Sequence, residues 1–333
     1  MAILKNLIAM ALKPVLKLVG KDNQIALLRH LLFKNVRQSV WVDSDNQKLF
    51  YDFEKIGFHI LPVHFYSPLP DTGTLADAVW EPYDTADMGY DDEAMLKLLT
   101  ELSQYKTEVM DIPMEQVDRQ QYYYNNIAFN GMDAVMYYYM IRHFKPAKLV
   151  EIGSGYSTLI AAKAVLQNES ENINTIFTAI EPYPMDFLLN DGGQLLGLHK
   201  LIPEFLQNIP LSFFEELESG DILFIDSTHV SKIGSDVNYI FLKILPLLKP
   251  GVIIHFHDIF LPNEMPKEWV KNLSILWNEQ YLLHTLLIAK GEFKTLMPNN
   301  YIGSRYESDA KKYMPALPYY MGGSYWIRKV EKG

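Results

Sequence analysis

The hydrophobic pattern changes character near Lys145-Pro146. Beyond this point, short apolar runs with little internal alternation are separated by stretches with helical spacing. Such runs are typical of strands buried on both faces of a parallel sheet. We predict strands over Lys148–Ile152, Thr175–Ile180, His199–Ile202, Asp221–Ile225, Val252–Phe256, Phe293–Met297 and Tyr325–Val330, and helices over Ser157–Leu166, Leu211–Leu217, Asp236–Leu248 and Glu268–Ala289. Right-handed strand–helix–strand units in this order predict a doubly wound α/β fold.

The first residues of the chain predict an amphipathic helix. Apolar residues recur at helical spacing between residues 3 and 33, and Lys5, Lys13 and Lys17 lie largely on the other side. A basic amphipathic helix can lie on a membrane surface, and residues 1–35 are the candidate for such contact. Packing on the protein's own body or on a partner subunit is the interpretation that we favour.

The rest of the N-terminal part is less regular. Residues 40–93 show no sustained periodicity, whereas residues 92–108 have a helical pattern. Apolar residues on all sides predict a buried helix over Met132–Phe144. We therefore expect a mainly helical cap over residues 1–120 and a sheet domain over residues 121–333.

Composition narrows the classes of function. The chain of 333 residues has 40 acidic and 30 basic residues, so it lacks the positive charge that nucleic-acid backbones attract. It contains no cysteine, which excludes disulfides, cysteine nucleophiles and cysteine-bound metals. No apolar run reaches the length of a membrane span, and the run before Lys13 is too short for a signal peptide. We expect a cytoplasmic homo-oligomer.

A glycine-containing turn follows the first predicted strand, in the stretch Leu149–Thr158. Gly153 and Gly155 allow a ligand to approach the backbone at the carboxyl end of this strand. A dinucleotide fingerprint requires a third glycine where this chain has Thr158. The turn therefore favours a ligand other than a pyrophosphate.

Two carboxylates accompany this turn. Glu151 precedes the glycines, where it would repel a phosphate but could pair with an amino group. Glu181 ends the second predicted strand, a position suited to hydrogen bonds with a ribose diol. A ribose with a cationic tail and no phosphate fits both positions, and S-adenosylmethionine is such a ligand.

Four sequence blocks in this order resemble the class I S-adenosylmethionine-dependent methyltransferases. The blocks are Val150–Thr158, Ala179–Tyr183, Gly220–His229 and Lys249–Asp258. The resemblance implies a mostly parallel, seven-stranded, Rossmann-like sheet whose final strand is reversed. It also implies that Glu181 binds the ribose. The other cofactor-contacting residues that it implies are Glu151, Gly153, Ser154, Gly155, Ser157 and Asp226.

A second group of polar residues follows the next two predicted strands. Asp226 and His229 come after one, and His257 and Asp258 after the other. One interpretation makes a histidine, His257 or His229, the general base that takes the proton from an acceptor hydroxyl. The other makes Asp226, His257 and Asp258 ligands of a divalent metal that lowers the pKa of this hydroxyl. We expect His255 to be a core residue.

The metal interpretation has its own resemblance. Metal-dependent O-methyltransferases that act on catechols and macrolide sugars carry carboxylates at places matching Asp226 and Asp258. The sugar-acting relatives have a carboxylate where this chain has His257. Histidine shifts the preference away from magnesium, which favours oxygen ligands, and magnesium, manganese and iron remain the candidate ions.

The predicted function is transfer of a methyl group to the hydroxyl of a small sugar-like or aromatic metabolite. An iron-dependent hydroxylase on the same fold, or a non-catalytic scaffold, is the alternative. Residues 299–323, rich in Tyr, Asn and Gly, predict a loop that covers the substrate.

Overall fold

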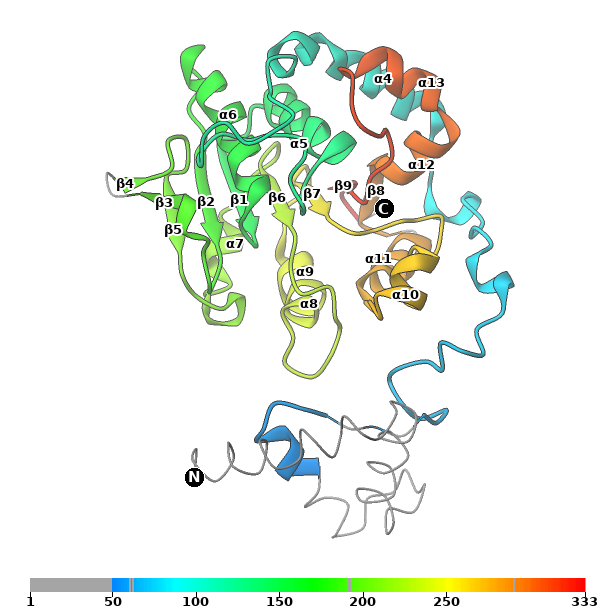
Figure 1. Ribbon diagram of the computed structural model, residues 1–333. Helices are drawn as coiled ribbons and strands as arrows, with labels where there is room; N and C mark the ends of the chain where they lie inside the picture. The colour runs from blue at the N-terminus through cyan, green and yellow to red at the C-terminus, as the bar shows by residue number, and fades with distance from the viewer. Residues whose placement is uncertain (1–49, 60, 62, 191–192, 290, 333) are drawn as a thin grey trace. The chain divides into compact units, whose positions relative to one another are not determined.

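A seven-stranded sheet forms the centre of residues 76–333, one of two compact units into which the chain divides (Figure 1). The strand order is β5-β2-β1-β6-β7-β9-β8. All neighbouring strands are parallel except β9, which runs antiparallel to both β7 and β8. The strands are β1 (Lys148–Ile152), β2 (Ile176–Ile180), β5 (Lys200–Ile202), β6 (Ile222–Ile225), β7 (Ile253–Phe256), β8 (Phe293–Pro298) and β9 (Tyr325–Lys329). The predicted fold is confirmed, reversed strand included.

The computed structural model describes residues 50–332 except positions 60, 62, 191, 192 and 290. The predicted helix over residues 3–33 lies outside this part of the chain. A short antiparallel pair of strands with two residues each, β3 (Leu189–Asn190) and β4 (Gly193–Gln194), was not predicted. The helices are α4 (Asp92–Leu102), α5 (Gly131–Phe144), α6 (Tyr156–Ser170), α7 (Ser212–Glu215), α8 (Asp236–Tyr239), α9 (Leu245–Leu247), α10 (Lys267–Asn272), α11 (Glu279–Ile288), α12 (Asn299–Arg305) and α13 (Glu307–Tyr313).

Successive strand residues face opposite sides of the sheet, and each side has its own core. On one side, Leu149 of β1 and Phe224 of β6 pack in a cluster with residues of α4, α5 and α6. On the other side, Val150 and Leu223 pack in a cluster with residues from α7, α9 and α11. Two covered faces explain why the strands read as continuous apolar runs.

The compact units divide between Leu75 and Ala76, whereas the sequence placed the boundary at residue 120. The difference arises because α4 is amphipathic. Its buried residues Met95, Leu99 and Leu102 join the same core as α5. Among the residues that the structure describes, no helix has the length and apolar character needed to cross a membrane.

Two stretches differ from the predicted secondary structure. The single helix expected over Glu268–Ala289 is broken between α10 and α11, and Ser274 has a left-handed backbone with φ 56°. The expected loop over residues 299–323 begins with two helices, α12 and α13. Gly303 of α12 lies so close to the backbone of residue 320 that a Cβ would be 2.1 Å from its carbonyl oxygen, so the segment folds back on itself.

Candidate functional site

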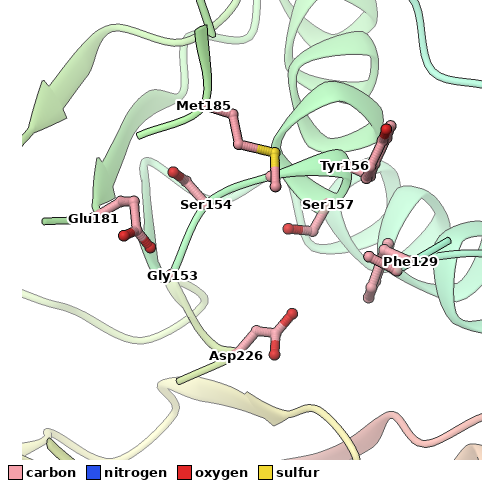
Figure 2. Close-up of a pocket in the computed structure, with 10 residues that line it drawn as sticks. Phe129, Gly153, Ser154, Tyr156, Ser157, Glu181, Met185 and Asp226 are labelled. Atoms are coloured by element: carbon pink, nitrogen blue, oxygen red, sulfur yellow. The ribbon is translucent and has the colours of Figure 1, made fainter. Parts of the chain in front are cut away.

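A cavity of about 130 Å³ opens at the carboxyl ends of β1, β2 and β6 (Figure 2). Backbone hydrogen bonds join these strand ends: Gly153 N donates to Ile180 O and Asp226 N donates to Ile152 O, both at 2.9 Å. The residues that line the cavity are Ala128, Phe129, Gly153, Ser154, Gly155, Tyr156, Ser157, Glu181, Met185 and Asp226. Six of the predicted cofactor-contacting residues therefore line one cavity, and Glu151 is the exception.

The turn between β1 and α6 is built around Gly153. Its φ is +85°, and a Cβ at this position would lie 2.0 Å from the carbonyl oxygen of Asp226. Gly155 has open space where a Cβ would be, and its N–H donates to Thr158 Oγ1 at 2.9 Å. Thr158, which occupies the place of a third glycine, thus caps the turn. The turn approaches β6 more closely than any side chain would allow.

Glu151 lies behind the turn and is fully buried. Ser157 Oγ donates a hydrogen bond to its Oε1, while Oε2 has no hydrogen-bond partner. Burial raises the pKa of Glu151 to about 8, against the lowering effect of Ser157 and Thr158. A buried carboxyl with one unused oxygen can pair with a cationic group that enters the cavity from the side of Ser157.

Glu151→Gln is expected to raise the melting temperature at about pH 8 and to change it little at about pH 5. The folded state keeps the proton of Glu151 up to pH 8, whereas an unfolded glutamate loses it near about pH 4.3. The free energy of unfolding therefore falls as the pH rises through this window, and the amide removes the effect. Thermal melts at both pH values check this, with exposed Glu204→Gln as the control. Equal shifts at the two pH values would contradict the assignment.

Glu181 follows β2 and enters the cavity beside Met185 (Figure 2). Its backbone N–H donates to Ile202 O at 3.0 Å, which ties the end of β2 to β5. Its Oε1 accepts a hydrogen bond from Tyr183 N at 2.8 Å. This bond holds the carboxylate in place and leaves Oε2 for a ligand.

The second polar group converges beside Asp226, at the ends of β6 and β7. His229 Nε2 lies 3.2 Å from Asp226 Oδ1 and 3.6 Å from Asp258 Oδ2. His257 Nδ1 lies 3.5 Å and 3.7 Å from the same two atoms. Both histidines thus direct one ring nitrogen towards the same pair of carboxylates. Asp226 also lines the cavity, so this cluster adjoins it.

Two further carboxylates, which the sequence analysis missed, face the other nitrogens of the two rings. Glu279 Oε2 lies 3.0 Å from His229 Nδ1, and Asp133 Oδ2 lies 3.6 Å from His257 Nε2. Asp133 also accepts hydrogen bonds from Asn299 Nδ2, Gly323 N and Ser324 N. A signal for Asp133 was present, because a lone acid within an otherwise apolar helix needs buried partners.

The charges of this cluster change its pKa values. Burial opposes the charged form of His229, but hydrogen bonds to Asp226 and Glu279 outweigh it and raise the pKa to about 10. The pKa of His257 is raised in the same way, against burial, by Asp258 and Asp226. Burial also opposes ionisation of Asp226, but the two histidines lower its pKa. The carboxylates therefore favour the charged forms of both rings.

The donor atoms fit a divalent ion. One ligand atom each from Asp226, His229 and Asp258 lie within 4.8 Å of one another, in the part of the chain that the structure describes. Two carboxylate oxygens and an imidazole nitrogen suit manganese or iron better than magnesium. His229 joins this set where the sequence predicted His257, although His257 faces the same carboxylates.

Other predicted residues have a clear place. His255 is fully buried in β7, its ring stacks 3.9 Å from that of Phe224, and its Nε2 lies 2.8 Å from Ser324 Oγ. Its expected core role is confirmed. Phe129 and Met185 of the cavity wall were missed because each lies in a connecting segment outside the β-strands and α-helices. Only the Tyr122–Asn130 segment before α5 carried a signal, its high aromatic content.

Comparison with known proteins gives one family. Residues 150–259 match the model of a methyltransferase domain. An uncharacterized protein of Archaeoglobus fulgidus is 34% identical over 176 residues, which cover 50% of this chain and 78% of that protein. The similar solved structures include two at low sequence identity. CmcI in an apo form is 12% identical with a TM-score of 0.40 and covers 88% of this chain and 97% of its own.

The second is the MycE methyltransferase from the mycinamycin biosynthetic pathway, in complex with Mg, SAH and mycinamycin VI. It is 13% identical with a TM-score of 0.34 and covers 70% of this chain and 53% of its own.

Proposed function

Because the chain belongs to the class I S-adenosylmethionine-dependent methyltransferases, we propose that it methylates a hydroxyl group of a small molecule, a sugar or an aromatic metabolite. The observation that supports oxygen as the acceptor is the cluster of two histidines and four carboxylates at the edge of the cavity. A hydroxyl must lose its proton during the transfer, and such a cluster can take it.

Bound S-adenosylmethionine would supply a methyl group on a sulfonium leaving group. The chain itself has to bind this cofactor, align the acceptor hydroxyl with the methyl group and take the proton of the hydroxyl. Gly153 and Ser154 form the turn that would receive the cofactor. Glu151 and Ser157 would lie behind the amino group at the methionine end of the cofactor. Glu181, at the opposite side of the turn, would accept hydrogen bonds from the ribose diol. The buried Ser154 Oγ lacks a hydrogen-bond partner among the described residues and is available to the ligand.

We assign proton acceptance to His257. Both nitrogens of His229 are already engaged, at 3.0 Å by Glu279 and at 3.2 Å by Asp226. His257 Nδ1 has only longer contacts, at 3.5 Å and 3.7 Å. Bound S-adenosylmethionine would give its methyl group to the acceptor oxygen with cleavage of the carbon–sulfur bond, and His257 Nδ1 would take the hydroxyl proton.

His257 must be neutral to accept this proton, although its pKa is raised in the chain alone. A positive charge near Asp226 and Asp258 would offset their effect and lower the pKa of the ring, so that His257 would be neutral and able to accept a proton. Asp226, His229 and Asp258 would hold a divalent ion for this purpose, and the ion would lower the pKa of the acceptor hydroxyl.

The decisive test is calorimetric titration with S-adenosylhomocysteine, first in EDTA and then with magnesium, manganese or iron(II). Micromolar binding is expected in EDTA. Methyl transfer from labelled S-adenosylmethionine to a panel of monosaccharides and catechols follows, with and without each metal. Absence of binding under every condition would refute the proposal, and iron-dependent oxygen uptake would favour a hydroxylase instead.

Glu181→Ala is expected to weaken S-adenosylhomocysteine binding by about 10- to 150-fold, which corresponds to about 1.5–3 kcal/mol for lost charge-assisted hydrogen bonds. Glu204→Ala is the matched control, because this exposed carboxylate lies near the end of β5 and, among the residues that the structure describes, accepts a side-chain hydrogen bond from Asn208 alone. Calorimetry of both variants measures the effect. Equal affinities of the two variants would show that Glu181 does not bind the ribose.

A further inference from the structure

The segment that leads into α11 holds His229 from several sides. The backbone N–H groups of Asn278 and Glu279 both donate to the carbonyl oxygen of His229 at 3.1 Å. The ring centroid of Trp277 lies 4.4 Å from that of His229. His229 itself has a left-handed backbone with φ 59°, a conformation that is costly for a residue with a side chain. These contacts maintain a strained backbone that aims one ring at the site.

The carboxylate of Glu279 is an unusual part of this arrangement, because it is 2% exposed. Its Oε2 contacts His229 Nδ1, and its Oε1 has no hydrogen-bond partner within the described residues. A buried, half-satisfied carboxylate stabilises a fold less than a packed apolar side chain would. Its presence therefore points to a role in the site.

We propose that Glu279 is a positioning residue that occupies Nδ1 of His229 and thereby turns Nε2 towards Asp226 and Asp258. The partner of one imidazole nitrogen determines which nitrogen faces a site, because the ring can otherwise rotate by half a turn. Trp277 packs against the ring and restricts this rotation further. The proposal rests on the proposed function, in which Asp226, His229 and Asp258 would hold a divalent ion beside the acceptor.

This role also accounts for the break between α10 and α11. In the segment between the two helices, Asn278 Oδ1 accepts a hydrogen bond from Ser231 N at 2.6 Å, and Glu279 contacts His229. Glu279 is the first residue of α11, where a negative charge is favoured by the helix dipole. The chain thus begins a new helix at the residue that contacts the histidine.

The test compares Glu279→Ala and Glu279→Gln with a control, Glu264→Ala, in the full chain. Glu264 is also a buried carboxylate of this region, but it accepts hydrogen bonds from Gln280, from the backbone N–H of Met265 and from the hydroxyls of Tyr83 and Tyr281. The first readout is the NMR resonance of the His229 Nδ1 proton and its protection from exchange. The second is methyl transfer to the acceptor panel, with S-adenosylhomocysteine affinity measured in parallel.

The Nδ1 proton signal of His229 is expected in the wild type and in Glu264→Ala. It should be shifted in Glu279→Gln, because the amide oxygen can still accept the hydrogen bond, and it should vanish in Glu279→Ala. The kcat of Glu279→Ala should fall about 10- to 100-fold, with partial rescue by glutamine and unchanged S-adenosylhomocysteine affinity. A retained signal in Glu279→Ala, or an equal fall of kcat in Glu264→Ala, would overturn the proposal. If the wild-type protein transferred no methyl group to any acceptor of the panel, the proposed function would be refuted. The NMR comparison would still decide whether Glu279 positions His229.

Discussion

Replacement of His257 by alanine is expected to lower methyl transfer by about 10²- to 10⁴-fold, the usual contribution of a general base. Affinity for S-adenosylhomocysteine should remain near the wild-type value, because His257 is not among the residues that line the cavity. An effect on kcat with intact cofactor binding separates loss of chemistry from loss of the site.

The fold should tolerate this change. Asp133, which faces the ring of His257, keeps its three other hydrogen-bond donors, Asn299, Gly323 and Ser324. His257 is also the first residue after β7, so its removal leaves the strand intact. Melting curves and calorimetry of His257→Ala would establish folding and binding before turnover is measured.

The matched control is His284→Ala, which removes a half-buried histidine of α11 that packs on Tyr83. This variant should retain turnover once corrected for its folded fraction. Full activity of His257→Ala on the same acceptor would exclude the base and metal interpretations of this residue together.

Gly153→Ala is expected to abolish S-adenosylhomocysteine binding and to lower the free energy of unfolding by about 2–4 kcal/mol. Two costs add at this position. The backbone has φ +85°, and the new Cβ would overlap the carbonyl oxygen of Asp226 at 2.0 Å. Backbone atoms cannot move aside as a flexible side chain can, so the turn and the end of β6 must separate. That separation displaces two walls of the cavity.

Gly220→Ala separates the two costs. Gly220 has φ +90°, but no atom lies within 4 Å of its Cβ position, and it precedes β6 at the end remote from the cavity. Backbone strain alone should therefore lower the free energy of unfolding of Gly220→Ala, by about 1–2 kcal/mol, and cofactor binding should be retained. Urea unfolding and calorimetry of both variants measure the difference. Wild-type binding by Gly153→Ala would mean that the close approach to Asp226 does not shape the site.

The Gly153 turn also shows where sequence reasoning succeeded. A strand, two glycines and a helix start are local features, and their order defines the end of β1 without knowledge of any contact. Glu181 and Asp226 were predictable for the same reason, because each follows a buried apolar strand at the edge where parallel strand ends meet.

The sequence by itself determined the succession of strands and helices along the chain and the residues at the strand ends, because these follow from local periodicity. The reversal of β9 was implied by the resemblance to the methyltransferase family, and the order of the strands within the sheet came from the structure. Only the tertiary structure decided that Glu279 contacts His229, 50 residues away, and that Asp133 meets His257. It also decided the break before α11 and the helices α12 and α13. Such contacts depend on how elements distant in sequence pack, and the hydrophobic pattern of one element carries no record of which side chain of another will lie against it.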